Sequence, residues 1–132
     1  MTADLASFKD RPFGCPPDTV LDVPVPPSVN RTRSVNWVGM REATAWRKRA
    51  GMMLMASGQY RRAQKKIPRF EVEIVLCETL CKLDLDNTAK HAIDYLRHLG
   101  IITNDAPQNM RRVTVEWGLA PAGCRITVRP CE

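Results

Sequence analysis

The sequence predicts an α+β fold with the element order β-α-β-α-β-β, in which helices pack against one mixed sheet. Two patterns predict it: apolar and polar residues alternate where we expect half-buried strands, and apolar residues recur every three or four positions where we expect helices. Because these patterns succeed each other along only 132 residues, we expect one domain. It should span 18–132 and follow a flexible N-terminal arm over 1–17, which is polar and rich in Gly and Pro.

The first strand should lie near Val20, where a short apolar alternation begins before Pro24, Pro26 and Pro27 stop it. Proline cannot donate to a β-ladder, so this segment is expected to be an edge strand or an extended lead into a loop.

A long helix with a basic shell should follow from about Met40. Its apolar stripe is expected to contain Trp46, Ala50, Met53 and Ser57, with Leu54 beside it. The run from Met52 to Met55 is too apolar for a fully exposed helix face. We expect two of its side chains to pack on the sheet, and we leave the others open between packing and a dimer contact.

The alternation in "RFEVEIVL" predicts a strand with one buried face. A second helix is expected in "DNTAKHAIDYLRHLG", with Asp86 as its N-cap and Gly100 as its C-terminal glycine. The segments "RRVTVEW" and "CRITVR" should form two final strands, paired as a hairpin through "GLAPAG". Trp46 on the helix stripe and Trp117 in the strand alternation are expected to belong to the core.

The charge favours a polyanionic partner such as nucleic acid, because 20 Lys and Arg outnumber 14 Asp and Glu. Between Arg41 and Arg69, nine basic residues accompany a single acid, Glu42. A solvated helix face is the alternative, but this imbalance is large for a solubility device. The candidate DNA-binding residues are Arg31, Arg33, Arg47, Lys48, Arg61, Arg62, Lys65 and Lys66.

The sequence suggests a cytoplasmic protein with no membrane partner. No apolar run approaches the roughly 20 residues of a membrane span, and the N-terminal segment lacks the apolar core of a signal peptide. The five cysteines show no paired close spacing, so we expect reduced thiols.

The segment "KLDLDNTAK" is the strongest candidate for chemistry. In an extended backbone the carboxylates of Asp84 and Asp86 would point to the same side, and a divalent cation such as Mg²⁺ would turn their repulsion into attraction. Asp105 could join them only if the strand order brings it alongside, whereas Lys90, one turn beyond Asp86, could hold a phosphate. The alternatives are a helix cap at Asp86, a solvated loop at Asp84 and a surface ion pair of Lys90 with Asp94.

In this order, "VPVPPSVNRTR", the basic helix, "RFEVEIVL" and "LDLDNTAKHAIDYLRHLGIITND" resemble the RusA family of Holliday junction resolvases of bacteria and phages. The likeness covers the chain from about Val23 to the last strands. Its most specific part is D-x-D-N, followed by a lysine four residues after the second aspartate, a helix ending in glycine, and a later aspartate.

The resemblance implies a RusA-like fold and a homodimeric endonuclease that nicks four-way DNA junctions symmetrically with Mg²⁺ or Mn²⁺. It implies Asp84, Asp86 and Asp105 as metal ligands and Lys90 as a further catalytic residue. The chain departs from the family pattern at Asn104, where family members commonly carry an acid, and at Pro107. Two alternatives therefore stay open: a catalytically impaired DNA-binding module of the same fold, and a nuclease for forks or flaps.

Overall fold

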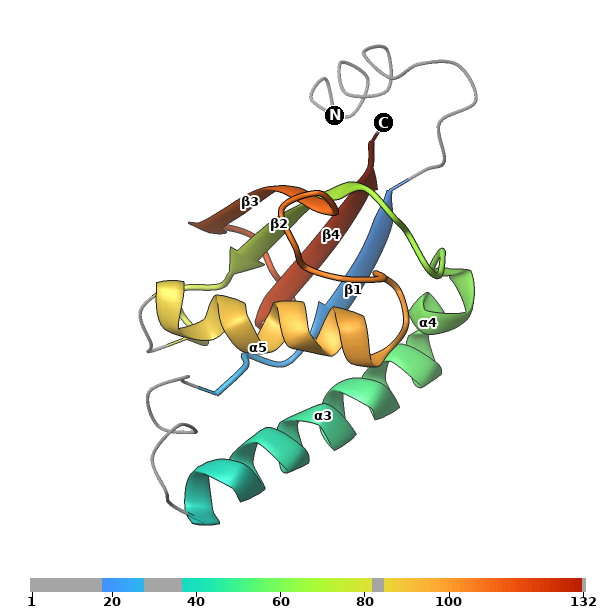
Figure 1. Ribbon diagram of the computed structural model, residues 1–132. Helices are drawn as coiled ribbons and strands as arrows, with labels where there is room; N and C mark the ends of the chain where they lie inside the picture. Colours follow the sequence, from blue (N-terminus) through green and yellow to red (C-terminus); the bar gives the residue numbers. More distant parts are fainter. Residues whose placement is uncertain (1–17, 28–36, 82–84, 132) are drawn as a thin grey trace.

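Four strands form one mixed sheet in the computed structural model, which describes residues 18–27, 37–81 and 85–131 (Figure 1). The strands are β1 (Thr19–Val23), β2 (Phe70–Leu76), β3 (Met110–Trp117) and β4 (Cys124–Pro130), and their order across the sheet is β1-β4-β2-β3. β4 is antiparallel to both of its neighbours, whereas β2 and β3 are parallel. β1, β2 and β3 therefore end at the same side of the sheet, which we call the carboxyl edge. The α+β class and the mixed sheet are confirmed; the expected arm over 1–17 lies outside the described residues.

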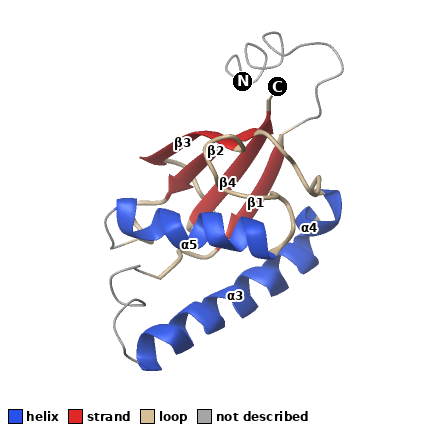
Figure 2. Cartoon of the chain, in the orientation of Figure 1, coloured by secondary structure: helices blue, strands red, loops and turns tan. Residues whose placement is uncertain are grey.

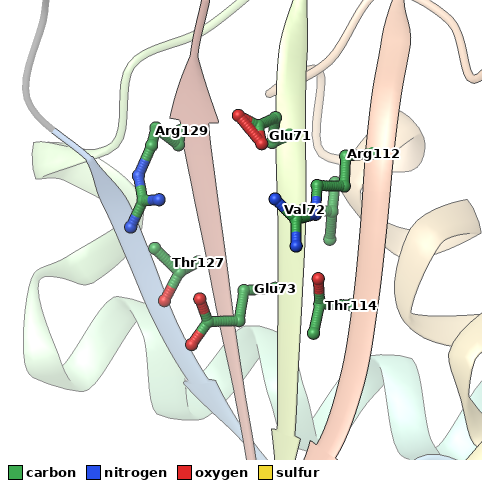
Figure 3. A pocket seen from close by; sticks show the side chains of 7 residues that line it. All are labelled: Glu71, Val72, Glu73, Arg112, Thr114, Thr127 and Arg129. Atoms are coloured by element: carbon green, nitrogen blue, oxygen red, sulfur yellow. The ribbon is translucent and has the colours of Figure 1, made fainter. Parts of the chain in front are cut away.

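The helices α3 (Trp37–Ser57), α4 (Gln59–Arg62) and α5 (Leu85–His98) lie on one face of this sheet (Figure 2). No helix of the described residues covers the other face, which we call the helix-free face (Figure 3). Strand alternation decides which face is covered, because every second residue of β2 and β4 is buried. The predicted strand in "RFEVEIVL" is confirmed, with Phe70, Val72, Ile74 and Leu76 in the core. No helix within the described ranges is both long and apolar enough to cross a membrane.

The predicted hairpin between the last two strands is wrong, because β2 lies between β3 and β4. The connection through "GLAPAG" instead passes the end of β2: the Gly118 N–H donates to the Leu76 carbonyl at 3.0 Å, and the Cys77 N–H donates to the Gly123 carbonyl at 3.0 Å. The chain passes from β2 to β3 through α5, and a helical connection of this kind allows the two strands to be parallel. β4 buries alternate side chains and takes a central position, whereas the polar β3 forms an edge. Trp117, at the end of this edge strand, is 42% exposed, so the expected core position of Trp117 is wrong.

The first helix is interrupted at Gly58, whose φ of 79° lies in the left-handed region, so the expected long helix is divided into α3 and the short α4. Trp46, Ala50 and Leu54 are buried along α3, which confirms the core position of Trp46. Met53 is 37% exposed, Met52 65% and Met55 72%. Leu54 alone of the run from Met52 to Met55 is buried, so the expectation of two packed side chains is wrong. The contact line follows a spacing of four residues, which leaves Met53 beside it.

The second helix differs from the prediction at its start. Because α5 begins at Leu85, Asp86 lies within its first turn rather than at the N-cap. Its end is confirmed: Gly100 has a φ of 77°, and the N–H groups of Gly100 and Ile101 donate to the carbonyls of Arg97 and Leu96, each at 3.1 Å.

Candidate functional site at the carboxyl edge

The candidate site lies where the chain leaves β2 and enters α5. The N–H groups of Leu80 and Cys81 donate to the Cys77 carbonyl at 3.1 and 2.8 Å, which closes a turn directly after β2. The arrowheads of β2 and β3 lie at the same side of the molecule as the start of α5 (Figure 1). Open sheets with parallel strands commonly bind ligands outside the carboxyl ends of those strands. The start of α5, which carries Asp86, therefore lies at an edge where ligand sites are common.

An open hollow of about 430 Å³ lies at this edge. Its walls come from the segment after β1, the first half of α3 and the turn after β2: Val25, Pro26, Pro27, Glu42, Ala45, Trp46, Arg49 and Leu80. Trp46 fixes one wall, because its indole Nε1–H donates to the Pro24 carbonyl at 2.8 Å. Arg49 is exposed and, within the described residues, has no acidic partner, so its charge is available to an anion.

The two clustered aspartates are only partly placed. Asp84 lies outside the described residues, and the backbone of Asp86 lies in the first turn of α5. The expected convergence of their carboxylates therefore stays a prediction. A carboxylate in the first turn of a helix is favoured by the partial positive charge of the helix N-terminus.

Lys90 lies one turn further along α5, with its side chain 47% exposed. Its Nζ donates to Asp94 Oδ1 at 3.1 Å. The surface ion pair of Lys90 with Asp94, which was the alternative interpretation, is thus present. Because it is exposed, the pair is weak, and Lys90 can exchange Asp94 for another anion. A phosphate-binding role for Lys90 stays a prediction.

Asp105 lies at the other end of α5. Arg97, in the last turn, places Nη1 3.3 Å from Asp105 Oδ1, and the same guanidinium reaches Asp94 Oδ1 at 3.8 Å. Asp86 and Arg97 are 11 residues apart on this helix, which corresponds to about 16 Å along its axis. The strand order does not bring Asp105 alongside the first turn of α5 within one chain.

A three-carboxylate metal site is therefore not assembled within the described part of a single chain, where no three His, Cys, Asp or Glu side chains converge as metal ligands. Asp105 is instead the last member of a row of charges on the exposed side of α5: Lys90, Asp94, Arg97 and Asp105. Sequence reasoning did not include Arg97 in the site, although its three-residue spacing from Asp94 was visible.

His91 connects α5 to the basic surface of α3. Burial lowers the pKa of His91 below its ordinary value; the charges of Arg47 and Lys90 lower it further, and Asp94 opposes them. The two helices are also joined directly, because the Tyr95 hydroxyl donates to the Arg47 carbonyl at 3.3 Å. Positive charge thus continues from α3 to the first half of α5.

The candidate DNA-binding residues have different environments. Arg31 and Arg33 lie outside the described residues. Arg47, Lys48, Arg61, Arg62 and Lys66 are exposed, and the described part of the chain offers none of them an ion-pair partner. Lys65 is partly buried: its ammonium donates to the carbonyls of Tyr60 and Ala63 at 2.6 and 2.8 Å and lies 4.2 Å from the centroid of the Tyr60 ring. Lys65 therefore stabilises the end of α4, a role that charge counting could not reveal.

The helix-free face of the sheet carries another, smaller hollow of about 200 Å³ (Figure 3). It is lined by Glu71, Val72, Glu73, Arg112, Thr114, Thr127 and Arg129. Acidic and basic side chains alternate here, so this face lacks the excess of positive charge that distinguishes α3.

No model of a known protein family matches the chain, and no curated protein matches it with significant similarity.

Proposed function

We propose that this protein is a structure-specific DNA endonuclease of the RusA type, which binds four-way junctions and nicks them with a divalent cation, Mg²⁺ or Mn²⁺. One observation supports this best: the carboxyl edge combines the start of α5, which carries Asp86, with an open hollow and with Arg49 of α3, which has no ion pair within the described residues. A carboxylate and an arginine beside an open hollow suit the cleavage of a phosphodiester, whose charge must be both bound and neutralised.

The chain's own residues would divide this work. Arg47 and Arg49 would hold phosphates of the substrate, and Lys90 would supply fixed positive charge beside the scissile phosphate once it exchanges Asp94 for that anion. Asp84 and Asp86 would hold the cation, which in such enzymes lowers the pKa of a bound water and offsets charge in the transition state.

A non-catalytic DNA-binding module is the second candidate, and the position of Asp105 favours it. The carboxylate of Asp105 pairs with Arg97 at the far end of α5. Within one chain it is therefore remote from the start of that helix, and the aspartate pair would act without a third acid.

The test is nicking of a labelled synthetic four-way junction in Mg²⁺, in Mn²⁺ and in EDTA. We compare the wild type with Asp86→Asn, Lys90→Gln and Asp105→Asn. Glu73→Gln is the matched control, because this carboxylate lies on the helix-free face. We expect metal-dependent paired nicks that fall roughly a hundredfold in Asp86→Asn and persist in Glu73→Gln. A fork, a flap and a plain duplex test the substrate.

Tight junction binding without nicks in either metal would support the DNA-binding module instead. Equal cleavage of forks and four-way junctions would keep the nuclease and reject the junction preference. The Asp105→Asn variant decides whether the third acid takes part: unchanged nicking excludes it.

A further inference from the structure

Three of the cysteines lie together where β2 ends. Cys77 directly follows Leu76, which pairs with Cys124 of β4, and Cys81 comes four residues later in the chain. Cys81 and Cys124 are buried, whereas Cys77 is partly exposed. Burial, with smaller contributions from Cys81 and Asp22, raises the pKa of the Cys124 thiol to about 12, which keeps that thiol protonated. Cys77 is therefore the thiol of this cluster that a reagent in solution reaches.

The turn after β2 stabilises the thiolate form of Cys77. Its Sγ lies 3.0 Å from the hydroxyl oxygen of Thr79. This hydrogen bond is the main reason that the pKa of the Cys77 thiol is lowered. The N–H groups of Thr79 and Leu80 lower the same pKa further, whereas desolvation and the charge of Glu78 oppose them. Because the thiolate is the nucleophilic form of cysteine, this environment favours reaction of Cys77 with an oxidant.

Cys81 lies one backbone turn beyond Cys77. Its N–H donates to the Cys77 carbonyl at 2.8 Å, which is the i→i+4 hydrogen bond of an α-helical turn. Residues related in this way have Cα atoms about 6 Å apart, within the roughly 4.4–6.8 Å that a disulfide spans. A bond between Cys77 and Cys81 lies within this single turn, so it can form without separating any strands of the sheet.

Cys131 provides a comparison within the same chain. It is also partly exposed, but it follows the other end of β4, where its N–H donates to the Arg69 carbonyl at 3.0 Å. Because β4 is antiparallel to β2, Cys131 lies at the start of β2 and the Cys77 cluster at its end. The length of the sheet separates the two exposed thiols.

We propose that Cys77 is a site of reversible oxidation by hydroperoxides, and that Cys81 resolves the oxidised form into a disulfide. In the first step the Cys77 thiolate attacks one peroxide oxygen. An S–O bond forms, the O–O bond breaks, and the leaving oxygen takes up a proton as water or an alcohol, which leaves Cys77 as a sulfenic acid.

In the second step the sulfur of Cys81 attacks Cys77 Sγ. The Cys81 thiol gives up its proton, the S–S bond forms, the S–O bond breaks, and the oxygen leaves as water. One hydroperoxide is thus reduced by the two electrons that the two thiols lose. A thiol reductant reverses the reaction by exchange with the disulfide. The site is argued from the thiols and their turn alone, so it does not rest on the proposed function.

The first test exposes the reduced, full-length protein to hydrogen peroxide, alkylates the remaining thiols and cleaves the chain after glutamate. Cleavage after Glu78 separates Cys77 from Cys81, unless a disulfide holds the two peptides together. We expect linked peptides after peroxide and separate peptides after dithiothreitol. Cys77→Ser should abolish the linkage, and Cys131→Ser, the matched control, should leave it unchanged. In Cys81→Ser, a sulfenic acid at Cys77 should accumulate and react with dimedone.

The second test measures the reactivity of Cys77 without an oxidant. Iodoacetamide alkylates wild type and Thr79→Val between pH 6 and pH 9, and mass spectrometry follows each thiol. Thr79→Val removes the hydroxyl but keeps the shape of the side chain, so the alkylation rate of Cys77 at pH 7 should fall roughly three- to tenfold. Its pH profile should move to higher pH, and Cys131 in the same samples should react as in wild type.

Three outcomes would overturn the proposal. They are linkage of Cys77 to a cysteine other than Cys81, equal oxidation of Cys77 and Cys131, and an unchanged alkylation rate of Cys77 in Thr79→Val. None of these results depends on whether the protein cleaves DNA.

Discussion

The ion pairs of Asp94 and the pKa of His91 depend more on burial and neighbouring charge than on the sequence motif that contains these residues. Asp94 accepts from Lys90 and also lies 3.8 Å from Arg97. His91, next to Lys90 in the sequence, is partly buried, and this burial is the main cause of its lowered pKa. The imidazole is therefore kept neutral near pH 7, which suits a packing role better than a cationic DNA contact.

The lowered pKa of His91 makes stability depend on pH. The unfolded chain has the higher pKa, about 6.5, so it binds more protons as pH falls. We expect the free energy of unfolding to decrease as pH drops from above 6.5 through the folded-state pKa, and then to level off for this group. His91→Gln should remove part of this decrease.

Urea unfolding of both proteins between pH 5 and pH 8 measures this effect. His98→Gln is the control, since His98 is exposed on the same helix. Parallel pH curves for His91→Gln and wild type would contradict the prediction.

At the scale of elements, local sequence patterns predicted the strands and helices. They did not predict which strands pair with each other. Alternation identified β2 and β4, and Gly100 identified the end of α5. The hairpin prediction failed because a six-residue connection can join two neighbouring strands or pass the end of a strand that lies between them. The alternation of apolar and polar residues does not distinguish these two arrangements. The position of Asp105 relative to Asp86 stayed open at the sequence level for the same reason: it depends on where α5 runs, and no local pattern specifies that.

The turn before β4 should tolerate substitution poorly. Gly123 has a φ of 117°, and a Cβ there would lie 2.8 Å from Val25 Cγ2 and 3.2 Å from the Val25 backbone nitrogen. Backbone strain and steric overlap add at this position, so Gly123→Ala should lower the free energy of unfolding by about 3 kcal/mol. At Gly100 the φ is also positive, but a Cβ would meet nothing within 4 Å. Gly100→Ala should therefore cost only about 1 kcal/mol. Chemical denaturation of the two variants compares them directly, and equal losses would contradict the steric argument.

At the scale of the whole molecule, the two faces of the sheet differ in charge. On the helix-free face Arg125 pairs with Asp22 at 2.8 Å and Arg129 with Asp18 at 3.4 Å, so much of its positive charge is neutralised. The cations of α3 lie on the helical side and carry a net excess. A polyanion should therefore approach from the helical side, where the carboxyl-edge hollow also opens between α3 and the turn after β2.

This asymmetry predicts how DNA binding responds to salt. Each phosphate neutralised on a duplex arm contributes about 0.9 to the slope of log K against log salt. Arg47→Gln and Lys48→Gln, on the helical side, should each reduce that slope by about 0.9, because their charges are free to meet phosphates. Arg129→Gln removes the same charge from the helix-free face, where it already meets Asp18, and should leave the slope unchanged. Fluorescence anisotropy with a labelled junction in EDTA, over a series of salt concentrations, measures all three slopes without cleavage. Equal reductions of the slope for Arg129→Gln and Lys48→Gln would mean that both faces contact DNA, and would contradict the proposal that DNA binds on the helical side.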